Sequence, residues 1–253
     1  MKFWNRINKK PIIIWWGVNT SIVDFEEGIR AEEPIPILKK FLIEYAGIND
    51  KTKQMARCPS ILDELQNVYG VKPYYDYKLN IDSDDEIITK DHSQRFFDSH
   101  IDIKSKKLMA FRSNLIFFAP YEKSLVMSQV APSLEDNDIA NKTLTIPGQF
   151  DIGKYFRCLE FAFIFKKETS SIQFLREQVY FYIRFHTTRP IIFRQFYWDK
   201  EINKYDRPMM AAKKHKYSKD PINTVLPYYY KLFDKFQFKK KIIKIIEKNL
   251  TKC

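Results

Sequence analysis

The feature that most constrains the fold of this chain is a series of short strand-like runs. Turn signals separate these runs, and no helical pattern interrupts them. Between Tyr75 and Ile81, aromatic and aliphatic residues alternate with mostly polar ones, as in a strand with one packed face. Further runs follow at 108–120, 125–130, 156–165, 178–186 and 191–198. Many strands at short spacing predict a mainly β (α+β) protein whose body is an antiparallel sandwich or resembles a jelly roll.

A strand and two helices are predicted ahead of this series. Ile12–Trp16 is a β-branched and aromatic run, which is typical of a buried strand. A helical pattern of apolar residues opens at Pro34–Pro36 and ends near Gly47. A second short helix is predicted after Cys58–Pro59, with Gly70 as its end.

Composition predicts a folded protein. Of 253 residues, 45% are hydrophobic and only 6 are glycine, which excludes disordered and collagen-like chains. No run reaches the roughly 18 apolar residues of a membrane span, and the first residues lack a secretory signal. We therefore expect an intracellular location, without secretion. The 3 cysteines support neither a disulfide framework nor a zinc site.

The positive charge of the chain is concentrated at its C-terminal end. From Asp199 onward there are 15 basic and 6 acidic residues, whereas residues 1–198 carry 28 and 25. The sequence therefore predicts a nearly neutral domain at 1–198 and a basic helical extension at 199–253. Such an extension favours nucleic acid, an acidic protein or anionic lipid as a partner.

The last part of the extension reads as a basic amphipathic helix. Isoleucines recur at helical spacing between Ile242 and Ile246, and lysines lie between the apolar positions. One interpretation is that the apolar stripe packs on the sheet and the lysines only meet solvent. The other is that the helix docks a partner. On that interpretation the partner-binding residues are Lys235, Lys239, Lys240, Lys241, Lys244 and Lys248.

Three segments of the chain form a collinear set: Arg57–Asp63 with its Cys-Pro pair, the run from Ile146 to Asp151 leading into Phe161–Phe163, and Val179–Phe196. In their order and spacing these segments resemble an uncharacterised family found in tailed phages of aquatic bacteria and in some bacteria. In that family a Cys-Pro pair follows an N-terminal helix, a Pro-Gly-x-x-Asp turn comes late, and a β-hairpin closes the fold. The resemblance implies an all-β body and a viral or bacterial setting, with the protein in the host cytoplasm or in a virion. It implies no activity, since the family has none established.

One set of residues could hold a metal. His100, Asp102 and a later His186 resemble the facial triad of Fe(II) oxygenases that use 2-oxoglutarate, with Arg194 in the place of the cosubstrate-binding arginine. If 187–190 is a four-residue hairpin loop, however, the alternation of the flanking strands puts His186 and Arg194 on opposite faces. The oxygenase is therefore kept only as an alternative, with Fe(II) and 2-oxoglutarate as its cofactors.

The same hairpin would leave Arg194 as the one charged residue on an apolar face. A buried guanidinium without a partner would cost several kcal/mol, so an ion pair is expected. Asp151, Asp76 and Glu160 are the candidate partners, and Asp151 is preferred because it lies beside a rigid Pro-Gly turn.

Other chemical groups give weaker signals. Cys58 precedes a predicted helix, whose N-terminus would lower the thiol pKa, but no histidine lies in a motif that would activate it. Cys158 lies in a strand and is interpreted as a packing residue. Residues 82–100 are acidic and aperiodic, which predicts a solvated loop. A calcium-binding loop is not predicted there, because the glycine and the glutamate that such a loop requires are absent.

The sequence thus requires no catalytic residue and no cofactor. We expect a non-enzymatic interaction protein or virion-associated structural protein, encoded by a phage if the resemblance holds. Its basic tail would dock on an acidic virion or host protein. A nucleic-acid-binding accessory protein is the further alternative, because aromatic residues lie among the lysines of the tail.

Overall fold

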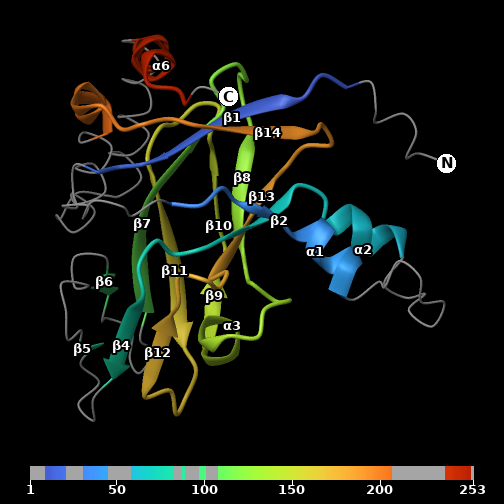
Figure 1. Ribbon diagram of the computed structural model, residues 1–253. Helices are drawn as coiled ribbons and strands as arrows, with labels where there is room; N and C mark the ends of the chain where they lie inside the picture. Colours follow the sequence, from blue (N-terminus) through green and yellow to red (C-terminus); the bar gives the residue numbers. More distant parts are fainter. Residues whose placement is uncertain are drawn as a thin grey trace, which may run out of the picture.

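The computed structural model describes residues 9–20, 31–44, 58–81, 87–88, 97–100, 108–206 and 237–251, and Figure 1 shows their arrangement. The fold of these residues is mainly β, with three sheets and some short helices. The predicted fold class is confirmed at this level.

Sheet A holds the longest strands. It has the order β14-β1-β7-β11-β9, and β6 pairs with the part of β7 that β1 leaves free. The strands are β14 (Ile191–Gln195), β1 (Ile12–Val18), β7 (Leu108–Phe118), β11 (Cys158–Phe165), β9 (Thr143–Ile146) and β6 (Phe97–His100). β1 runs parallel to β14, while the other pairs of this sheet are antiparallel.

Two further sheets complete the β body. Sheet B has the order β10 (Gly148–Asp151), β8 (Val126–Val130), β13 (Phe181–Phe185), β3 (Val68–Val71) and β2 (Ile35–Pro36). Sheet C has the order β12 (Ser171–Phe174), β4 (Tyr77–Ile81) and β5 (Ile87–Ile88). The chain passes from sheet A to sheet B at Pro147, between β9 and β10.

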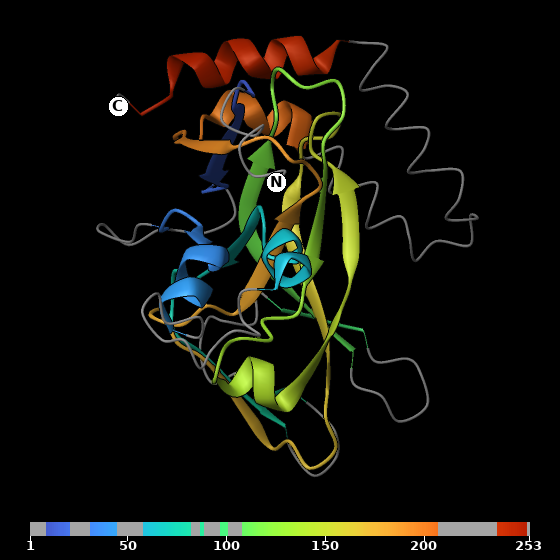
Figure 2. The ribbon, with the colours of Figure 1, turned by 90° about the vertical axis from the view of Figure 1, so that its right-hand side faces the viewer.

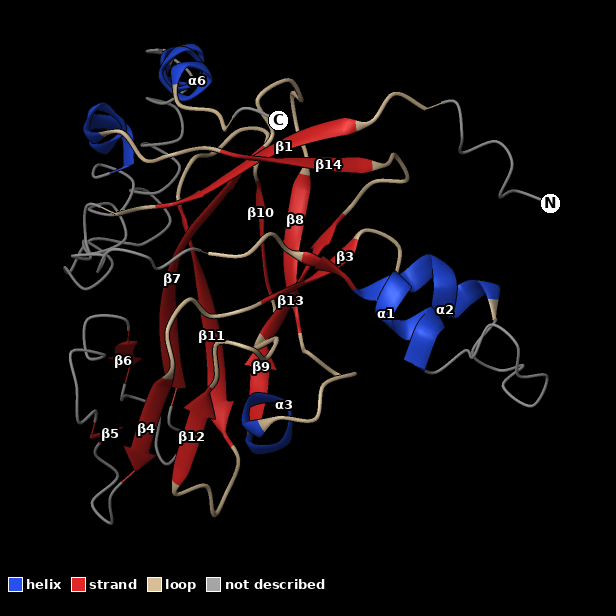
Figure 3. Ribbon diagram, viewed as in Figure 1, coloured by secondary structure: helices blue, strands red, loops and turns tan. Residues whose placement is uncertain are grey.

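The helices lie around the sheets, as the secondary-structure colours of Figure 3 show. They are α1 (Ile37–Glu44), α2 (Pro59–Glu64), α3 (Asp138–Lys142), the 3-10 helix η4 (Lys200–Ile202) and α6 (Phe238–Lys248). Figure 2 shows α6 lying across one end of the β body, with α3 towards the opposite end. α1 is amphipathic and buries Ile37 and Phe41.

Side chains from all three sheets form one large hydrophobic cluster, which we call the inner core. Its aromatic rings pack closely: Phe111 of β7 stacks on Phe174 of β12 at 5.4 Å, and Phe161 of β11 stacks on Phe181 of β13 at 5.0 Å. Burial of these apolar side chains is the main stabilising contribution to the fold.

A second cluster, the outer core, lies on the other face of sheet A. Alternation along β7 sends Phe117 to the inner core and Phe118 to the outer core, and alternation along β1 separates Trp16 from Trp15 in the same way. Ile202 and α6 complete this cluster. Its buried members are Trp15, Ile116, Phe118, Phe156, Cys158, Phe196, Ile202, Ile242 and Ile246.

The predicted closing hairpin is wrong. β13 pairs with β3 and β8 in sheet B, whereas β14 pairs in parallel with β1 in sheet A. The apolar run Ile12–Trp16 offers β14 a partner that is buried on both faces, and β3 and β8 take up both edges of β13. This parallel pair is also a departure from the purely antiparallel body that we predicted; the jelly-roll-like arrangement stays a prediction.

Two local predictions need correction. The helix after Cys58 ends at Glu64, and Gly70 lies inside β3, where Val179 side-chain atoms would lie 2.8 and 2.9 Å from a Cβ. The predicted loop at 82–100 contains β5 and β6. The other predicted strands are present, with ends that differ by a few residues.

The close approach of β1 to the end of β14 predicts the effect of one substitution. A Cβ at Gly17 would lie 2.7 Å from the backbone oxygen of Phe196 and 2.9 Å from its ring. Gly17→Ala should therefore lower the free energy of unfolding by about 1–3 kcal/mol, because the two strands must move apart. Urea denaturation measures this loss.

Gly148→Ala is the matched control, since a Cβ there would meet only the side-chain oxygen of Gln129 at 3.7 Å. If both substitutions destabilise the protein equally, the close approach at Gly17 is not what constrains this part of the fold.

Candidate interaction surface on the C-terminal helix

α6 is amphipathic and its apolar side faces the β body. Ile242 and Ile246, one turn apart, are fully buried in the outer core, and Ile243 and Ile245 are partly buried beside them. The helix begins after Gln237, which adopts a left-handed conformation with a φ of 52°. Burial of this stripe fixes which side chains point outward.

The residues after α6 hold its C-terminal end against β14. The backbone N–H of Tyr197 donates to Asn249 (3.0 Å), and that of Thr251 donates to Gln195 (3.0 Å). Phe196 and Leu250 thus form an antiparallel bridge, and the amide of Asn249 donates to the Asp199 carboxylate at 3.2 Å. The predicted extension is therefore packed on the body along its described part.

Lys239 holds the other end of the helix. Its ammonium donates to the backbone oxygens of Glu122 (2.6 Å), Gly153 (2.5 Å) and Ala119 (3.4 Å). It also lies 5.6 Å from the centre of the Phe118 ring. All three ammonium donors have acceptors, so Lys239, predicted to bind a partner, instead joins α6 to two loops of the body.

Four other lysines form the outward face of α6. Lys240, Lys241, Lys244 and Lys248 are exposed, and steps of three or four residues place them on one side of the helix. We call this set the lysine face. Among the ion pairs between described residues, none involves these lysines. Lys235, also predicted to bind a partner, lies outside the described residues.

Tyr121 lies near Glu247 of α6 and near Arg194 of β14. The Tyr121 side chain is 61% exposed and its ring meets the edge of Trp15 at 5.7 Å. Burial of part of the side chain raises the pKa of Tyr121, Glu247 raises it further, and Arg194 acts in the opposite direction. The exposed ring of Tyr121 is thus a neighbour of the acidic residue of α6.

The predicted burial of Arg194 and its ion pair with Asp151 are wrong. Arg194 is exposed, because β14 lies at the edge of sheet A rather than in a hairpin over the core. Asp151 serves the turn after β10: it accepts hydrogen bonds from Ser124 (2.5 Å) and from the backbone N–H groups of Leu125 and Gly153 (both 2.9 Å).

The environment of Asp151 stabilises its charged form. Partial burial acts to raise the pKa of this carboxyl, but the hydrogen bonds from Ser124, Leu125 and Gly153 and the charge of Lys154 hold it below its ordinary value. Asp151 is therefore a structural residue of the turn.

The possible iron ligands are only partly described. His186 is exposed, and its Nε2 lies 2.7 Å from the hydroxyl of Ser128. His100 lies in β6 opposite Leu108, and Asp102 lies outside the described residues. No group of three His, Cys, Asp or Glu side chains in the described part of the chain could hold a metal ion. The triad stays a prediction.

A buried polar cluster lies beside the outer core, and no sequence signal pointed to it. The amide nitrogen of Asn19 donates to Asp206 at 2.7 Å, and the Cys158 thiol lies 3.9 Å from the same carboxyl group. Burial raises the pKa of Asp206 to about 6, although the hydrogen bonds from Asn19 and Cys158 act in the opposite direction.

The two described cysteines differ in burial and in the direction in which their thiol pKa is shifted. Burial and then the nearby Asp206 raise the pKa of the Cys158 thiol well above its ordinary value, which agrees with its interpretation as a packing residue. At Cys58, a hydrogen bond with the Ser60 hydroxyl at 2.9 Å and the backbone N–H groups of Ser60 and Ile61 lower the thiol pKa. Cys58 is the residue before α2, as predicted.

Comparison with models of known protein families, with curated proteins and with solved structures found no match. The resemblance to a phage family therefore stays an expectation from the sequence. No helix among the described residues is long and apolar enough to cross a membrane.

The role of Lys239 predicts that two neighbouring lysines differ in their effect on stability. Lys239→Met should lower the free energy of unfolding by about 1–3 kcal/mol, because it leaves partly buried backbone oxygens without a donor. Hydrogen exchange should also become faster in α6. Lys240→Met, one residue further and exposed, should change neither measurement. Equal effects of the two substitutions would contradict the assigned role.

Asp206 predicts a dependence of stability on pH. Its pKa is raised on folding, from an ordinary value of 3.8 to about 6, so the folded state favours the protonated form. The stability that this preference contributes is complete at low pH and is lost as the pH rises from about 4 through about 6, an effect of about 3 kcal/mol.

Asp206→Asn keeps an oxygen for Asn19 and carries no charge at any pH. Relative to the unmodified protein, the variant should be more stable at pH 7.5 and similar at pH 4, as measured by urea denaturation. Glu44→Gln, which removes an exposed carboxylate, should have little effect at either pH. A gain for Asp206→Asn that is the same at both pH values would show that Asp206 does not titrate in this way.

Proposed function

We propose that this protein is a non-enzymatic interaction module that binds an acidic protein through the lysine face of α6. The observation that carries the proposal is the exposure of Lys240, Lys241, Lys244 and Lys248 on a helix whose opposite side is buried. No cofactor is needed for this function.

The anchoring of α6 supports binding rather than simple solvation. Ile242, Ile246 and Lys239 hold the backbone of the helix in one place, so a partner does not have to order it. A preorganised surface keeps more of the interaction energy than a mobile tail does. The lysine side chains still lose rotamer freedom on binding, which limits the gain at each of them.

The charge pattern supports an acidic partner. Four ammonium groups lie within about three turns of helix, and Glu247 is the acidic residue of α6 itself. A partner that presents carboxylates at a similar spacing, such as a helix with Asp or Glu every three or four residues, would match this row. Such a charged surface increases the association rate and makes binding depend on salt.

The setting of this interaction comes from the sequence. The resemblance to a family of tailed phages supports a partner in a virion or in the host cytoplasm. On this proposal the body of residues 1–198 is a sandwich-like support, and the basic segment from 199 to 253 supplies the contact.

Charge neutralisation tests the proposal. Lys240, Lys244 and Lys248 are changed together to Gln, and binding to a labelled acidic helical peptide is measured by fluorescence anisotropy at low and high salt. We expect the dissociation constant at low salt to rise about tenfold, since each exposed ion pair contributes up to about 1 kcal/mol. Binding by the unmodified protein should fall steeply with salt.

A matched control removes the same charge elsewhere: Lys10, Lys39 and Lys78, all exposed, are changed together to Gln. An equal loss in both triple variants would mean that net charge alone is responsible and would overturn the proposal. A single-stranded DNA probe of equal charge separates the partner classes. If the DNA probe binds more tightly than the acidic peptide, and only the α6 variant loses this binding, the partner is a nucleic acid and not an acidic protein.

A further inference from the structure

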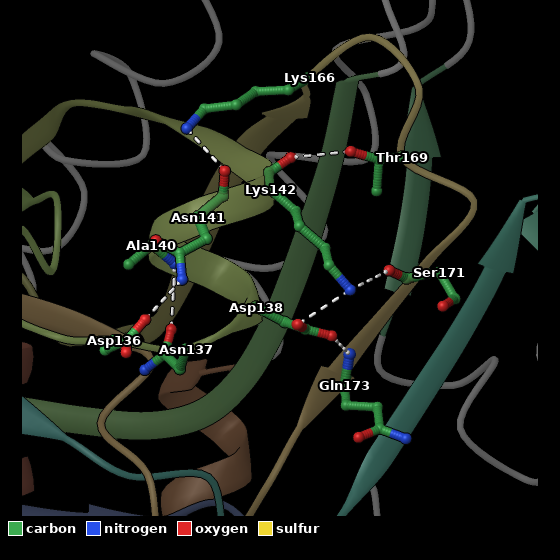
Figure 4. A network of polar contacts seen from close by, with 10 residues as sticks. All are labelled: Asp136, Asn137, Asp138, Ala140, Asn141, Lys142, Lys166, Thr169, Ser171 and Gln173. Carbon is green, nitrogen blue, oxygen red and sulfur yellow. Dashed lines mark hydrogen bonds and ion pairs between the residues drawn. The ribbon is translucent and has the colours of Figure 1, made fainter.

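A hollow at the other end of the molecule gathers lysines from two segments. Its volume is about 270 Å³, and it lies between the end of α3 and the loop that joins β11 to β12. Figure 4 shows the polar contacts that hold these segments together. The lining residues are Asn141, Lys142, Lys166, Lys167, Glu168, Thr169, Ser170 and Ser171.

The walls of the hollow are fixed by hydrogen bonds. The backbone N–H of Lys166 donates to the backbone oxygen of Lys142 at 2.9 Å, and the Thr169 hydroxyl donates to the same oxygen at 3.3 Å. Asp138, at the start of α3, accepts a hydrogen bond from the N–H of Gln173 at 2.9 Å. Helix and loop are therefore one unit, which Figure 4 shows from close by.

Two of the lysines are held in place and keep unused donors. The Lys142 ammonium contacts Asp138 at 2.9 Å and the backbone oxygen of Ser171 at 3.3 Å. The Lys166 ammonium donates to the backbone oxygen of Asn141 at 2.7 Å. Since an ammonium group has three donors, Lys142 retains one and Lys166 retains two.

Lys167 adds a cation that does not take part in holding the helix and the loop together. It is exposed, and no hydrogen bond or ion pair between described residues involves its ammonium group. Against these three lysines stand Glu168, which is among the lining residues, and Asp138, which contacts the Lys142 ammonium, so one positive charge remains in excess. The backbone of Glu168 has a φ of 71°, the left-handed conformation that turns the loop at this point. Ser170 and Ser171 are also among the lining residues.

We propose that this hollow is a binding site for a phosphate group. Its lining offers many hydrogen-bond donors and an excess of positive charge, which matches the several acceptor oxygens and the double charge of a phosphate monoester. A carboxylate offers two oxygens and one charge, and so uses fewer of the donors. The site is separate from the lysine face of α6, and its test does not depend on the function proposed for that face.

Titration with inorganic phosphate, followed by amide chemical shifts in nuclear magnetic resonance spectra, tests the site at constant ionic strength. We expect saturable shifts confined to residues 141–142 and 166–171. A parallel titration with adenosine monophosphate distinguishes free phosphate from a phosphate ester. Binding of either probe at this place supports the proposal, and a titration with acetate should give weaker shifts.

Lys167→Gln is the informative variant, because Lys142 and Lys166 also hold the loop and α3 together. It should raise the dissociation constant for phosphate about fivefold, by the loss of one exposed charge interaction. Lys248→Gln, on α6 at the opposite end of the molecule, should leave the constant unchanged. Absence of saturable shifts with both phosphate probes, or equal effects of the two variants, would overturn the proposal.

Discussion

The burial of sheet A on both of its faces is the constraint on which the rest of the structure depends. Residues 115 and 117 of β7 face the inner core, and residues 116 and 118 face the outer core. A strand with apolar side chains on both faces needs a cover on each side. Sheets B and C cover one face, and Ile202 with α6 covers the other. The C-terminal helix is thus a part of the core rather than an addition to it.

This cover also explains why lysines of one helix differ in role. An isolated helix of 11 residues with this much like charge would be marginal in water, so packing of Ile242 and Ile246 must stabilise α6. Once these two residues face the sheet, the helical geometry turns Lys239 toward two loops of the body and turns Lys240, Lys244 and Lys248 outward. The same residue type therefore supplies the attachment of the helix and the surface proposed to bind a partner.

The local periodicity of the sequence identified elements but not their partners. The run Ile12–Trp16 and the alternation near Tyr77 are visible in the sequence, and both form strands. The strand that lies beside β14 is decided by contacts between residues distant in the sequence. Because β13 directly precedes β14 in the chain, we predicted a hairpin of these two strands, and this hairpin does not form. The position of Arg194 followed from that register and was wrong with it.

The candidate site was predictable to a similar extent. Isoleucines at helical spacing predicted the amphipathic helix, but nothing in the local pattern separates Lys239 from Lys240, because the difference lies in the backbone oxygens of distant loops. The cluster of Asn19, Cys158 and Asp206 joins three distant segments and has no local signal either.

The claim that α6 is docked on the apolar outer face of sheet A is tested most directly by nuclear Overhauser effects in methyl-labelled protein. The account predicts cross-peaks from the methyl groups of Ile242 and Ile246 to the aromatic rings of the outer core, which include Trp15, Phe118 and Phe156. Isoleucine methyl signals of α6 at random-coil positions, without contacts to any of these rings, would contradict it.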